Sequence, residues 1–366
     1  MTVAGRRTIL IAPDSFKGSL TSVQVAQALA DGWLRARPND EVVMCPLADG
    51  GEGTLAAIEA AGGWTSRTAR VHDPLRRMID ARWLLSSDGS RAVVEMAEAS
   101  GLSRVAPAER DPVGATSVGT GELVGAAIDA GARHVTLGIG GSATTDGGRG
   151  LLEGLADGGR RTDATDVEVA CDVSNPLLGP TGAAATYGPQ KGASPEDVAA
   201  LDARNAAWAD ELEATEGRRE RDTPGAGAAG GVGFGLLAAQ GRFRSFALRP
   251  GIDLVMEATD FPARLSRADL VITGEGRADE QTLHGKAAMG VATLAAPRNT
   301  PVVLLCGALG DGAASLEAAT AFTVVQSIAE RPIDLASAMA DTERLLVAAG
   351  ARLARTVGIG LELARP

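Results

Sequence analysis

Residues 8–33 read TILIAPDSFKGSLTSVQVAQALADGW. A short apolar run, residues 9–12, is followed by a loop that contains Asp and Gly, and then by apolar residues at the 3.6-residue spacing of one helix face. The positions on that face are Ala26, Leu29, Ala30 and Trp33. Ser19 and Thr21 are the N-cap candidates. The stretch therefore predicts a β-strand, a polar loop and an amphipathic helix in that order.

The same order recurs along the chain. Apolar runs at 41–47, 134–137, 270–273 and 302–306 are followed by the loops ADGGEG (48–53), GIGGSATTDGG (138–148), GEGRADEQTLHGK (274–286) and GALGDG (307–312). Helical patterns follow at 54–61, near 150–155 and through residue 316, and residues 322–325 form a further short run. Strands that alternate with helices predict a parallel sheet with right-handed crossovers. In such a sheet, ligands bind where the carboxyl ends of the strands meet.

A second region departs from this alternation. Two β-rich runs, 79–86 and 91–95, flank the hairpin turn signal Asp88-Gly89, and residues 163–233 are irregular, with a polar helical segment at 195–220. We therefore predict the α/β class, with a Rossmann-like parallel-sheet domain formed by residues 1–71 and 256–366. A mixed α/β domain, residues 72–255, is inserted into it. The sequence leaves open to which domain the strand at 134–137 belongs.

Composition limits the classes of function. The chain has 366 residues, and roughly 150 residues per domain favours two domains. A net charge of −11 argues against nucleic-acid binding, which needs clustered Lys and Arg. No apolar run approaches the roughly 20 residues of a membrane span. The three cysteines lie far apart without a CxxC pair, which argues against disulfides or zinc and leads us to expect a cytoplasmic protein.

Lysine is rare in this chain. Lys17, Lys191 and Lys286 are its only lysines among 35 basic residues, and each lies in a stretch that contains glycine: DSFKGS, GPQKGA and LHGKAA. A coding bias that replaces Lys by Arg wherever either is tolerated would leave Lys only where Arg fails. Random retention is the alternative explanation.

Two glycine patterns invite a phosphate-binding interpretation. GIGGSA (138–143) directly follows an apolar run, and its backbone N–H groups at a helix N-terminus could hold a phosphate; a tight strand-to-helix turn is the alternative. GAGAAG (225–230) fits GxGxxG, but a charged segment precedes it where the dinucleotide motif requires a strand. A close-packed turn or helix start is therefore favoured there.

Charged residues gather at predicted strand ends. The loop 274–286 contains Glu275, Arg277, Asp279, Gln281 and Lys286. Asp14 and Asp49 each follow a strand directly, which places both at the carboxyl edge of the sheet, and Asp172 has a similar position. These residues predict a site, with helix capping as the alternative role for the aspartates.

The ordered motifs resemble the type 1 glycerate kinase family. The matching stretches are IAPDSFKGSLTS, PLADGGEGT, VEMAEASGL, TSVGTGEL, GIGGSATTDGG, ACDVSNPLLGP, YGPQKGA, PGAGAAGG and DLVITGEGRADEQTLHGK, from residue 11 to 286, with CGALGDG at 306–312. The resemblance implies ATP-dependent phosphorylation of D-glycerate to 2-phosphoglycerate with Mg2+. It also implies two α/β domains with the active site in the interdomain cleft. The partners implied are D-glycerate and ATP, without nucleic acid or membrane, and a homodimer is allowed.

Phosphoryl transfer needs cations on the phosphates, carboxylates for magnesium and a base near the accepting hydroxyl. The expected catalytic residues are Asp14, Lys17, Asp49, Asp172 and Lys286. The expected substrate-binding residues are Ser15, Arg277, Asp279 and Gln281, with Arg277 as a clamp for the glycerate carboxylate. The expected ATP or phosphate contacts are Gly140, Gly141, Ser142, Gly227, Gly230 and Lys191. The expected metal ligands are Asp14, Asp49 and Glu275.

The chain departs from the family pattern in two places. It is shorter than the family between residues 156 and 169, and Ser174 stands where the family usually has an acidic residue. Two other functions stay open at this point. One is an NAD(P)-dependent dehydrogenase of a small hydroxy acid, which would use GIGGSA or GAGAAG. The other is a sensor that binds a small metabolite without chemistry.

Overall fold

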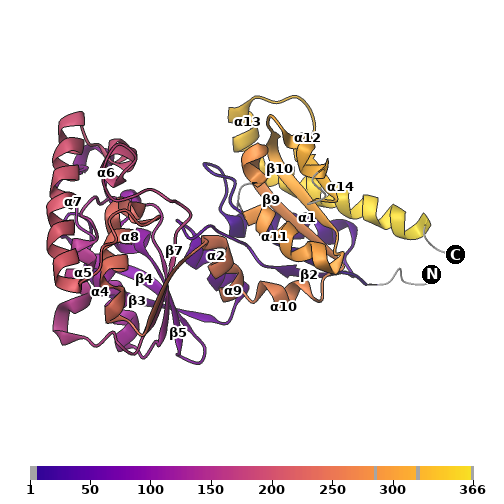
Figure 1. Ribbon diagram of the computed structural model, residues 1–366. Coiled ribbons are helices and arrows are strands. Elements are labelled where there is room, and N and C mark those ends of the chain that lie inside the picture. The colour runs from indigo at the N-terminus through magenta and orange to yellow at the C-terminus, as the bar shows by residue number, and fades with distance from the viewer. Residues whose placement is uncertain (1–5, 284–286, 319–321, 364–366) are drawn as a thin grey trace. The chain divides into compact units, whose positions relative to one another are not determined.

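The computed structural model describes residues 6–283, 287–318 and 322–363 (Figure 1). The chain divides into two compact units. The first, here the parallel-sheet unit, comprises residues 1–49, 56–62 and 255–366; the second, the mixed-sheet unit, comprises residues 50–55 and 63–254. This arrangement confirms the predicted α/β class, in which a mixed sheet is inserted within a parallel one.

The parallel-sheet unit contains five strands in the order β11-β10-β9-β1-β2. Their bounds are Thr8–Ile11 (β1), Glu41–Met44 (β2), Leu270–Ala278 (β9), Val302–Leu309 (β10) and Val324–Ser327 (β11). All neighbours pair in parallel. The chain passes from β1 to β2 on one side, whereas β9, β10 and β11 follow one another on the other side. The strand order therefore reverses between β1 and β9, and the carboxyl ends of these two strands flank the place where such sheets bind ligands.

The helices of this unit are α1 (Ser22–Ala36), α2 (Thr54–Ala61), α9 (Gly251–Ala258), α10 (Phe261–Leu265), α11 (Ala287–Ala295), α12 (Ala313–Ala318), α13 (Leu335–Ala340) and α14 (Thr342–Leu363). The first two residues of α2 and the first four residues of α9 belong to the mixed-sheet unit. Short 3-10 turns lie at Glu280–Leu283 (η6) and Ala296–Arg298 (η7). Thr21 is the N-cap of α1 and forms a capping box with Gln24. Ser19 is not the cap; its hydroxyl donates to Thr342 Oγ1 (2.7 Å) and the Met339 carbonyl (2.8 Å).

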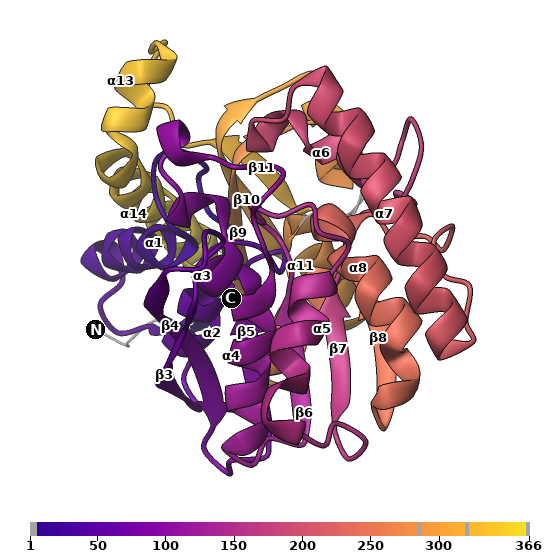
Figure 2. The same ribbon diagram turned by 90° about the vertical axis from the view of Figure 1, so that its left-hand side faces the viewer.

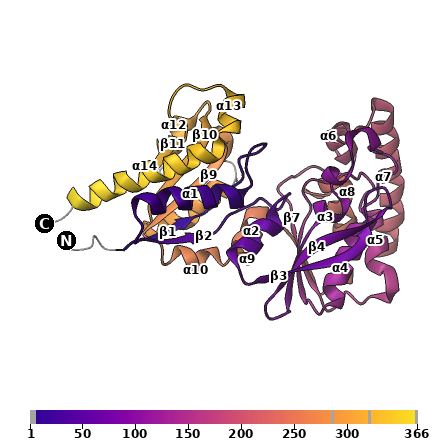
Figure 3. The same ribbon diagram turned by 180° about the vertical axis from the view of Figure 1, so that it is seen from behind.

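Helices α1 and α14 lie side by side, as Figure 3 shows. Glycine permits their close approach, because a Cβ on Gly32 would lie 2.2 Å from the Val347 carbonyl oxygen. Trp33 is fully buried in the core that these helices share with β1 and β9. Its indole N–H donates to Asp40 Oδ2 at 3.0 Å, so the polar atom of this large side chain is satisfied.

The mixed-sheet unit has six strands in sequence order, β3 to β8. Their bounds are Trp64–His72 (β3), Met78–Ser86 (β4), Arg91–Glu95 (β5), His134–Gly138 (β6), Asp166–Ala170 (β7) and Ser245–Arg249 (β8). The pairs β3–β4 and β4–β5 are antiparallel, which confirms the hairpin predicted at Asp88-Gly89, and the other pairs are parallel. Strand β6 pairs with β5 and β7, which answers the question that the sequence left open.

Its helices are α3 (Met96–Ser100), α4 (Val118–Asp129), α5 (Arg149–Ala156), α6 (Ala183–Tyr187), α7 (Pro195–Glu216) and α8 (Ala228–Ala238). Five 3-10 turns lie at Leu102–Arg104, Pro107–Glu109, Asp157–Gly159, Pro189–Lys191 and Ala239–Arg242. Helices α4, α5 and α8 belong to this unit (Figure 2). Their buried Leu, Val and Phe side chains form part of its hydrophobic core together with residues of the strands. Helix α7 ends before the predicted residue 220, because Gly217 adopts a left-handed conformation (φ 68°) that caps it.

No helix among the described residues combines the length and the apolar character that crossing a membrane requires.

Candidate active site

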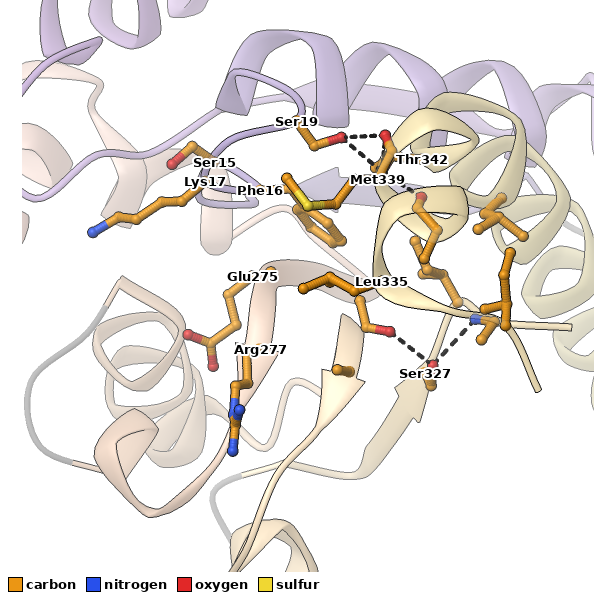
Figure 4. Close-up of a pocket in the computed structure, with 18 of the residues that line it drawn as sticks. Ser15, Phe16, Lys17, Ser19, Glu275, Arg277, Ser327, Leu335, Met339 and Thr342 are labelled. Carbon is orange, nitrogen blue, oxygen red and sulfur yellow. Dashed lines mark hydrogen bonds between the residues drawn. The ribbon is translucent and has the colours of Figure 1, made fainter. Parts of the chain in front are cut away.

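A cavity of about 750 Å³ opens in the parallel-sheet unit, at the carboxyl ends of β1, β9 and β10 (Figure 4). Six residues predicted from the sequence line it: Asp14, Ser15, Lys17, Asp49, Glu275 and Arg277. They come from three separate parts of the chain. The cavity thus lies at the reversal of strand order, where the topology of the sheet predicts a ligand site.

Asp14 lies on the loop that follows β1. The loop continues along β9, since the Ala12 and Asp14 N–H groups donate to the Ile272 and Gly274 carbonyls, both at 2.8 Å. Burial raises the pKa of the Asp14 carboxyl above its ordinary value, and the charge of Asp49 raises it further. The Lys17 ammonium and a 2.6 Å hydrogen bond from the Ser15 N–H lower it in part. The result is a carboxylate that accepts a proton more readily than an exposed one.

Glu275 and Arg277 lie on a strand, and the prediction that the whole of 274–286 is a loop was wrong. Strand β9 runs through Ala278, because it pairs with β10 as far as Leu309. The glycines at 274, 276 and 307 did not end the strands, since parallel neighbours satisfy their backbone groups. Alternation along the strand puts Glu275 and Arg277 on one face.

The two side chains differ in exposure. Glu275 is buried, and its Oε1 accepts a 2.6 Å hydrogen bond from the Thr282 hydroxyl. The Arg277 side chain is 65% exposed, and its Nε lies 3.2 Å from Asp279 Oδ2. An exposed guanidinium can turn toward a ligand carboxylate at little cost. Asp279, predicted as a substrate contact, is thus a partner of Arg277.

Gln281 belongs to η6, and the structure does not describe its side chain. Lys286 lies outside the described residues.

The GIGGSA loop in the mixed-sheet unit does not open a helix directly, which corrects the prediction from its sequence. Helix α5 begins only at Arg149, after TTDGG. The loop is bound to residues 100–102 instead: the Leu102 N–H donates to the Gly141 carbonyl (2.8 Å) and the Ala143 N–H donates to the Ser100 carbonyl (2.9 Å). Gly140 is needed for packing, because its Cβ would lie 2.6 Å from the Gly51 Cα.

The start of α5 is already occupied by a carboxylate. Asp146 accepts hydrogen bonds from the N–H groups of Ser117 (2.8 Å), Gly148 (3.2 Å) and Gly150 (3.2 Å). The N–H groups of Gly148 and Gly150 lie at the start of α5 and are donors that a phosphate would use at a helix N-terminus. An aspartate of the same loop therefore caps this helix internally.

Lys191 does not project into solvent, although the sequence predicted a phosphate contact. It is 4% exposed, and its Nζ donates to Ser142 Oγ (2.9 Å) and to the Thr144 carbonyl (2.5 Å). Burial lowers the pKa of its ammonium to about 7, and the nearby Asp146 acts in the opposite direction. In this structure Lys191 and Ser142 hold each other and the loop in place.

Gly227 and Gly230 are buried between neighbouring segments. A Cβ on Gly227 would lie 2.3 Å from the Pro176 carbonyl oxygen, and one on Gly230 would lie 1.9 Å from the Thr144 carbonyl oxygen. Gly230 also has a positive φ of 71°. The alternative that the sequence favoured, a close-packed turn, accounts for these glycines.

Asp172 follows β7, as predicted, and its Oδ1 accepts a 3.0 Å hydrogen bond from the Gly251 N–H at the start of α9. This contact matches the capping role that the sequence left open.

Glu95 is a residue that the sequence prediction missed. It is buried at the end of β5, and its two carboxylate oxygens accept 3.1 Å hydrogen bonds from the Gly53 and Leu55 N–H groups. Burial raises the pKa of Glu95 to about 7, and the charges of Glu98 and Glu52 add to the effect. Glu95 thereby fixes residues 50–55, the loop that follows Asp49. An acidic residue that ends an apolar strand was the signal in the sequence.

Known proteins resemble this chain over most of its length. The family model described as "Glycerate kinase family" matches residues 9–158 and 155–358. The two matched blocks meet where the chain was expected to be shorter than the family.

Several relatives cover most of the chain. It is 42% identical over 332 residues to a glycerate kinase of Halalkalibacterium halodurans, which covers 83% of this chain and 86% of that protein. It is 41% identical over 330 residues to the glycerate 2-kinase of Escherichia coli K12, with 83% and 86% covered. A solved crystal structure, described as a candidate glycerate kinase 2 of Salmonella typhimurium LT2, matches with a TM-score of 0.83 and 39% identity. The match covers 98% of this chain and all of that one.

Proposed function

Since this chain belongs to the glycerate kinase family, we propose that it transfers the γ-phosphoryl group of ATP to a hydroxyl of D-glycerate, giving 2-phosphoglycerate. The observation that carries this proposal is the group formed by Asp14, Lys17 and Arg277 around one cavity. It offers a base, a cation for phosphate and a partner for a carboxylate. Family membership favours a kinase over the dehydrogenase and the sensor, and the packing of Gly227 and Gly230 removes one of the two motifs that favoured a dehydrogenase.

Asp14 is the proposed general base. Its raised pKa brings it closer to the neutral range, in which a carboxylate accepts a proton effectively from a hydroxyl that attacks phosphorus. Lys17 lies three residues along the same loop and supplies positive charge beside it. In phosphoryl transfer, positioning and charge neutralisation account for most of the rate enhancement. This pair of residues provides both.

Arg277 is the proposed clamp for the glycerate carboxylate. Its guanidinium is a planar fork that can donate two parallel hydrogen bonds to a carboxylate. The side chain lines the cavity and is largely exposed, so it can reach a ligand without unfolding its strand. Ser15, on the loop from β1, is the proposed second polar contact for the substrate.

The carboxylates of the cavity suit magnesium, which prefers oxygen ligands. Asp49 raises the pKa of Asp14, so the two carboxylates repel each other and a cation would relieve that repulsion. Across the described residues, however, no three His, Cys, Asp or Glu side chains gather closely enough to form a metal cage. We therefore propose Asp49 and Glu275 as protein ligands, with phosphate oxygens and water completing the shell. When bound, the ion would neutralise charge on the phosphates.

The test is ADP release by the purified protein with ATP, magnesium and candidate acceptors. D-glycerate should support turnover, whereas L-glycerate and glycerol should be much poorer, because a chiral hydroxyl and a carboxylate clamp are both required. Turnover of glycerol equal to that of D-glycerate would contradict the assignment of Arg277. The product identifies the hydroxyl: 2-phosphoglycerate is consumed by enolase directly, whereas 3-phosphoglycerate is consumed only after a mutase is added.

A further inference from the structure

The cavity has two chemically different ends. Figure 4 shows Lys17, Glu275 and Arg277 on one side, and Leu335, Met339 and Thr342 on the other, with Phe16 between them. The first side carries the groups proposed for phosphoryl transfer. The second is formed by α13, the start of α14 and the segment after β11.

The second side is apolar in both its floor and its rim. Phe16, Ile328 and Leu345 are buried beneath it. Leu335 and Met339 form the rim and are exposed, by 73% and 37% respectively. They lie four residues apart on α13, so they share one face of that helix. Two large apolar side chains exposed together over a buried apolar floor indicate a binding surface.

α13 is joined to the loop that carries the proposed base. The Ser19 hydroxyl donates to the Met339 carbonyl and to the Thr342 hydroxyl, at 2.8 and 2.7 Å. The apolar rim and the polar loop are therefore held in a fixed relation within this unit. Arg331, exposed on the segment before α13, also lines this second side.

The size of the cavity exceeds what glycerate needs. A volume of about 750 Å³ is typical of sites for drug-sized ligands, whereas glycerate is a three-carbon acid. ATP has roughly four times as many non-hydrogen atoms and joins a flat, largely apolar base to a polyanionic chain. Its two parts match the two ends of the cavity. The glycines at 140, 227 and 230, which the sequence predicted to approach ATP, are instead packed against backbone.

We infer that the apolar end, formed by Phe16, Ile328, Leu335, Met339 and Leu345, binds the purine base of ATP, with the phosphates directed toward Lys17. The inference rests on the proposed function, since it takes ATP as the phosphoryl donor. It assigns the nucleotide to the parallel-sheet unit and gives the exposed apolar residues of α13 a role in affinity for the base.

The experiment compares a ligand that has the base with one that lacks it. Affinities for ADP and for tripolyphosphate, each with magnesium, are measured by calorimetry on the full chain and on the double variant Leu335→Ala/Met339→Ala. Ile359→Ala serves as the control, because it removes an exposed apolar side chain of α14 that does not line the cavity. The double variant should bind ADP about tenfold more weakly and tripolyphosphate with unchanged affinity.

Two results would overturn the inference: unchanged ADP affinity in the double variant, or an equal loss for ADP and tripolyphosphate. Both side chains are exposed, so the variant should keep the wild-type melting temperature, and a melting curve checks that it does. The proposed function is tested separately, by phosphorylation of D-glycerate by the wild type. An active wild type with unchanged ADP binding in the variant would contradict only the base site.

Discussion

At the scale of single residues, Asp14 and Lys17 differ from Asp172 and Lys191 in where they lie. Both line the cavity, and the positive charge of Lys17 lowers in part the raised pKa of Asp14. Asp172 was predicted as a catalytic residue and Lys191 as a phosphate contact, yet their side chains bond to protein backbone in the mixed-sheet unit. The residue type alone therefore could not separate a ligand contact from a structural one; the hydrogen-bond partner does.

Replacing Asp14 by Asn should lower kcat by at least about a hundredfold, because the amide cannot accept the hydroxyl proton. The melting temperature should stay within a few degrees of the wild type, since no charge is left unpaired. Asp31→Asn, at an exposed position on α1, is the control and should change neither quantity. Unfolding of the Asp14 variant would instead indicate a structural role.

Lys17 and Lys191 should respond differently to replacement by Arg. Lys17→Arg should lower turnover at least about tenfold, or about 1.4 kcal/mol of transition-state stabilisation, because a guanidinium is wider than an ammonium. Its stability should not change, since Lys17 is exposed. Lys191→Arg should instead destabilise the protein by about 1–3 kcal/mol, because its buried site between Ser142 and Thr144 cannot enlarge. Thermal melts and steady-state kinetics of both variants test this pair. If the Lys191→Arg variant melts at the same temperature as the wild type, the predicted destabilisation is wrong.

Glu95 should make stability depend on pH. Its pKa is 4.5 when unfolded and about 7 when folded, so between these values the folded state binds more protons than the unfolded state. The contribution of the Glu95 carboxyl to stability is complete below pH 4.5 and is lost as the pH rises through 7. As the pH rises from 4.5 to above 7, the free energy of unfolding of the wild type should fall by about 3 kcal/mol relative to that of the Glu95→Gln variant. Melting temperatures of both proteins from pH 5 to 8 measure the effect, and parallel profiles would contradict it.

At the scale of elements, the spacing of apolar residues was the most reliable guide to the strands. The apolar runs predicted the parallel strands and the hairpin at Asp88-Gly89, because burial on a sheet requires such runs. The site was only partly visible. The extension of β9 past Gly274 was missed, since pairing with β10 overrides the local preference of glycine. The hydrogen bond from the Ser117 N–H to Asp146 could not be predicted, because Ser117 lies far from Asp146 in sequence.

The contact between α1 and α14 predicts an unusual response to alanine. Alanine normally stabilises an exposed helix interior over glycine by about 1 kcal/mol. Gly32→Ala should destabilise this protein by about 1–3 kcal/mol instead, because the added Cβ would lie 2.2 Å from the Val347 carbonyl oxygen. Gly360→Ala on α14 is the matched control, with nothing within 4 Å of its Cβ, and should be neutral or stabilising. Urea unfolding measures both, and a stabilised Gly32 variant would show that the helices can separate.

At the scale of the whole molecule, the two units have separate cores. The mixed-sheet core draws only on residues between 69 and 248, and the parallel-sheet core draws on both ends of the chain. The break in the alternation of strands and helices predicted that a second unit is inserted into the parallel-sheet unit. It did not predict the residue at which the insertion begins. β3 begins at Trp64, whereas we placed the boundary at residue 72, because the exposed residues of an edge strand lack a clear apolar pattern.

A fragment of residues 50–254 should therefore fold alone. It contains all six strands of the mixed sheet and the loop that Glu95 holds. It should show a cooperative thermal transition by circular dichroism, whereas a fragment of residues 1–62 should not, because β1 would lack β9. A fragment 50–254 without a transition would show that the mixed sheet depends on the rest of the chain.

The division of the parallel sheet between the two ends of the chain has a consequence for synthesis on the ribosome. β1 pairs with β9, which begins at Leu270, and α1 packs against α14, which begins at Thr342. At about 5–20 residues per second, the N-terminal strand and helix wait on the order of ten seconds or more for those partners. During that time the mixed-sheet unit can complete its own fold, while the apolar face of α1 stays uncovered. Newly made chains should therefore depend on chaperones that shield the N-terminal segment until translation ends.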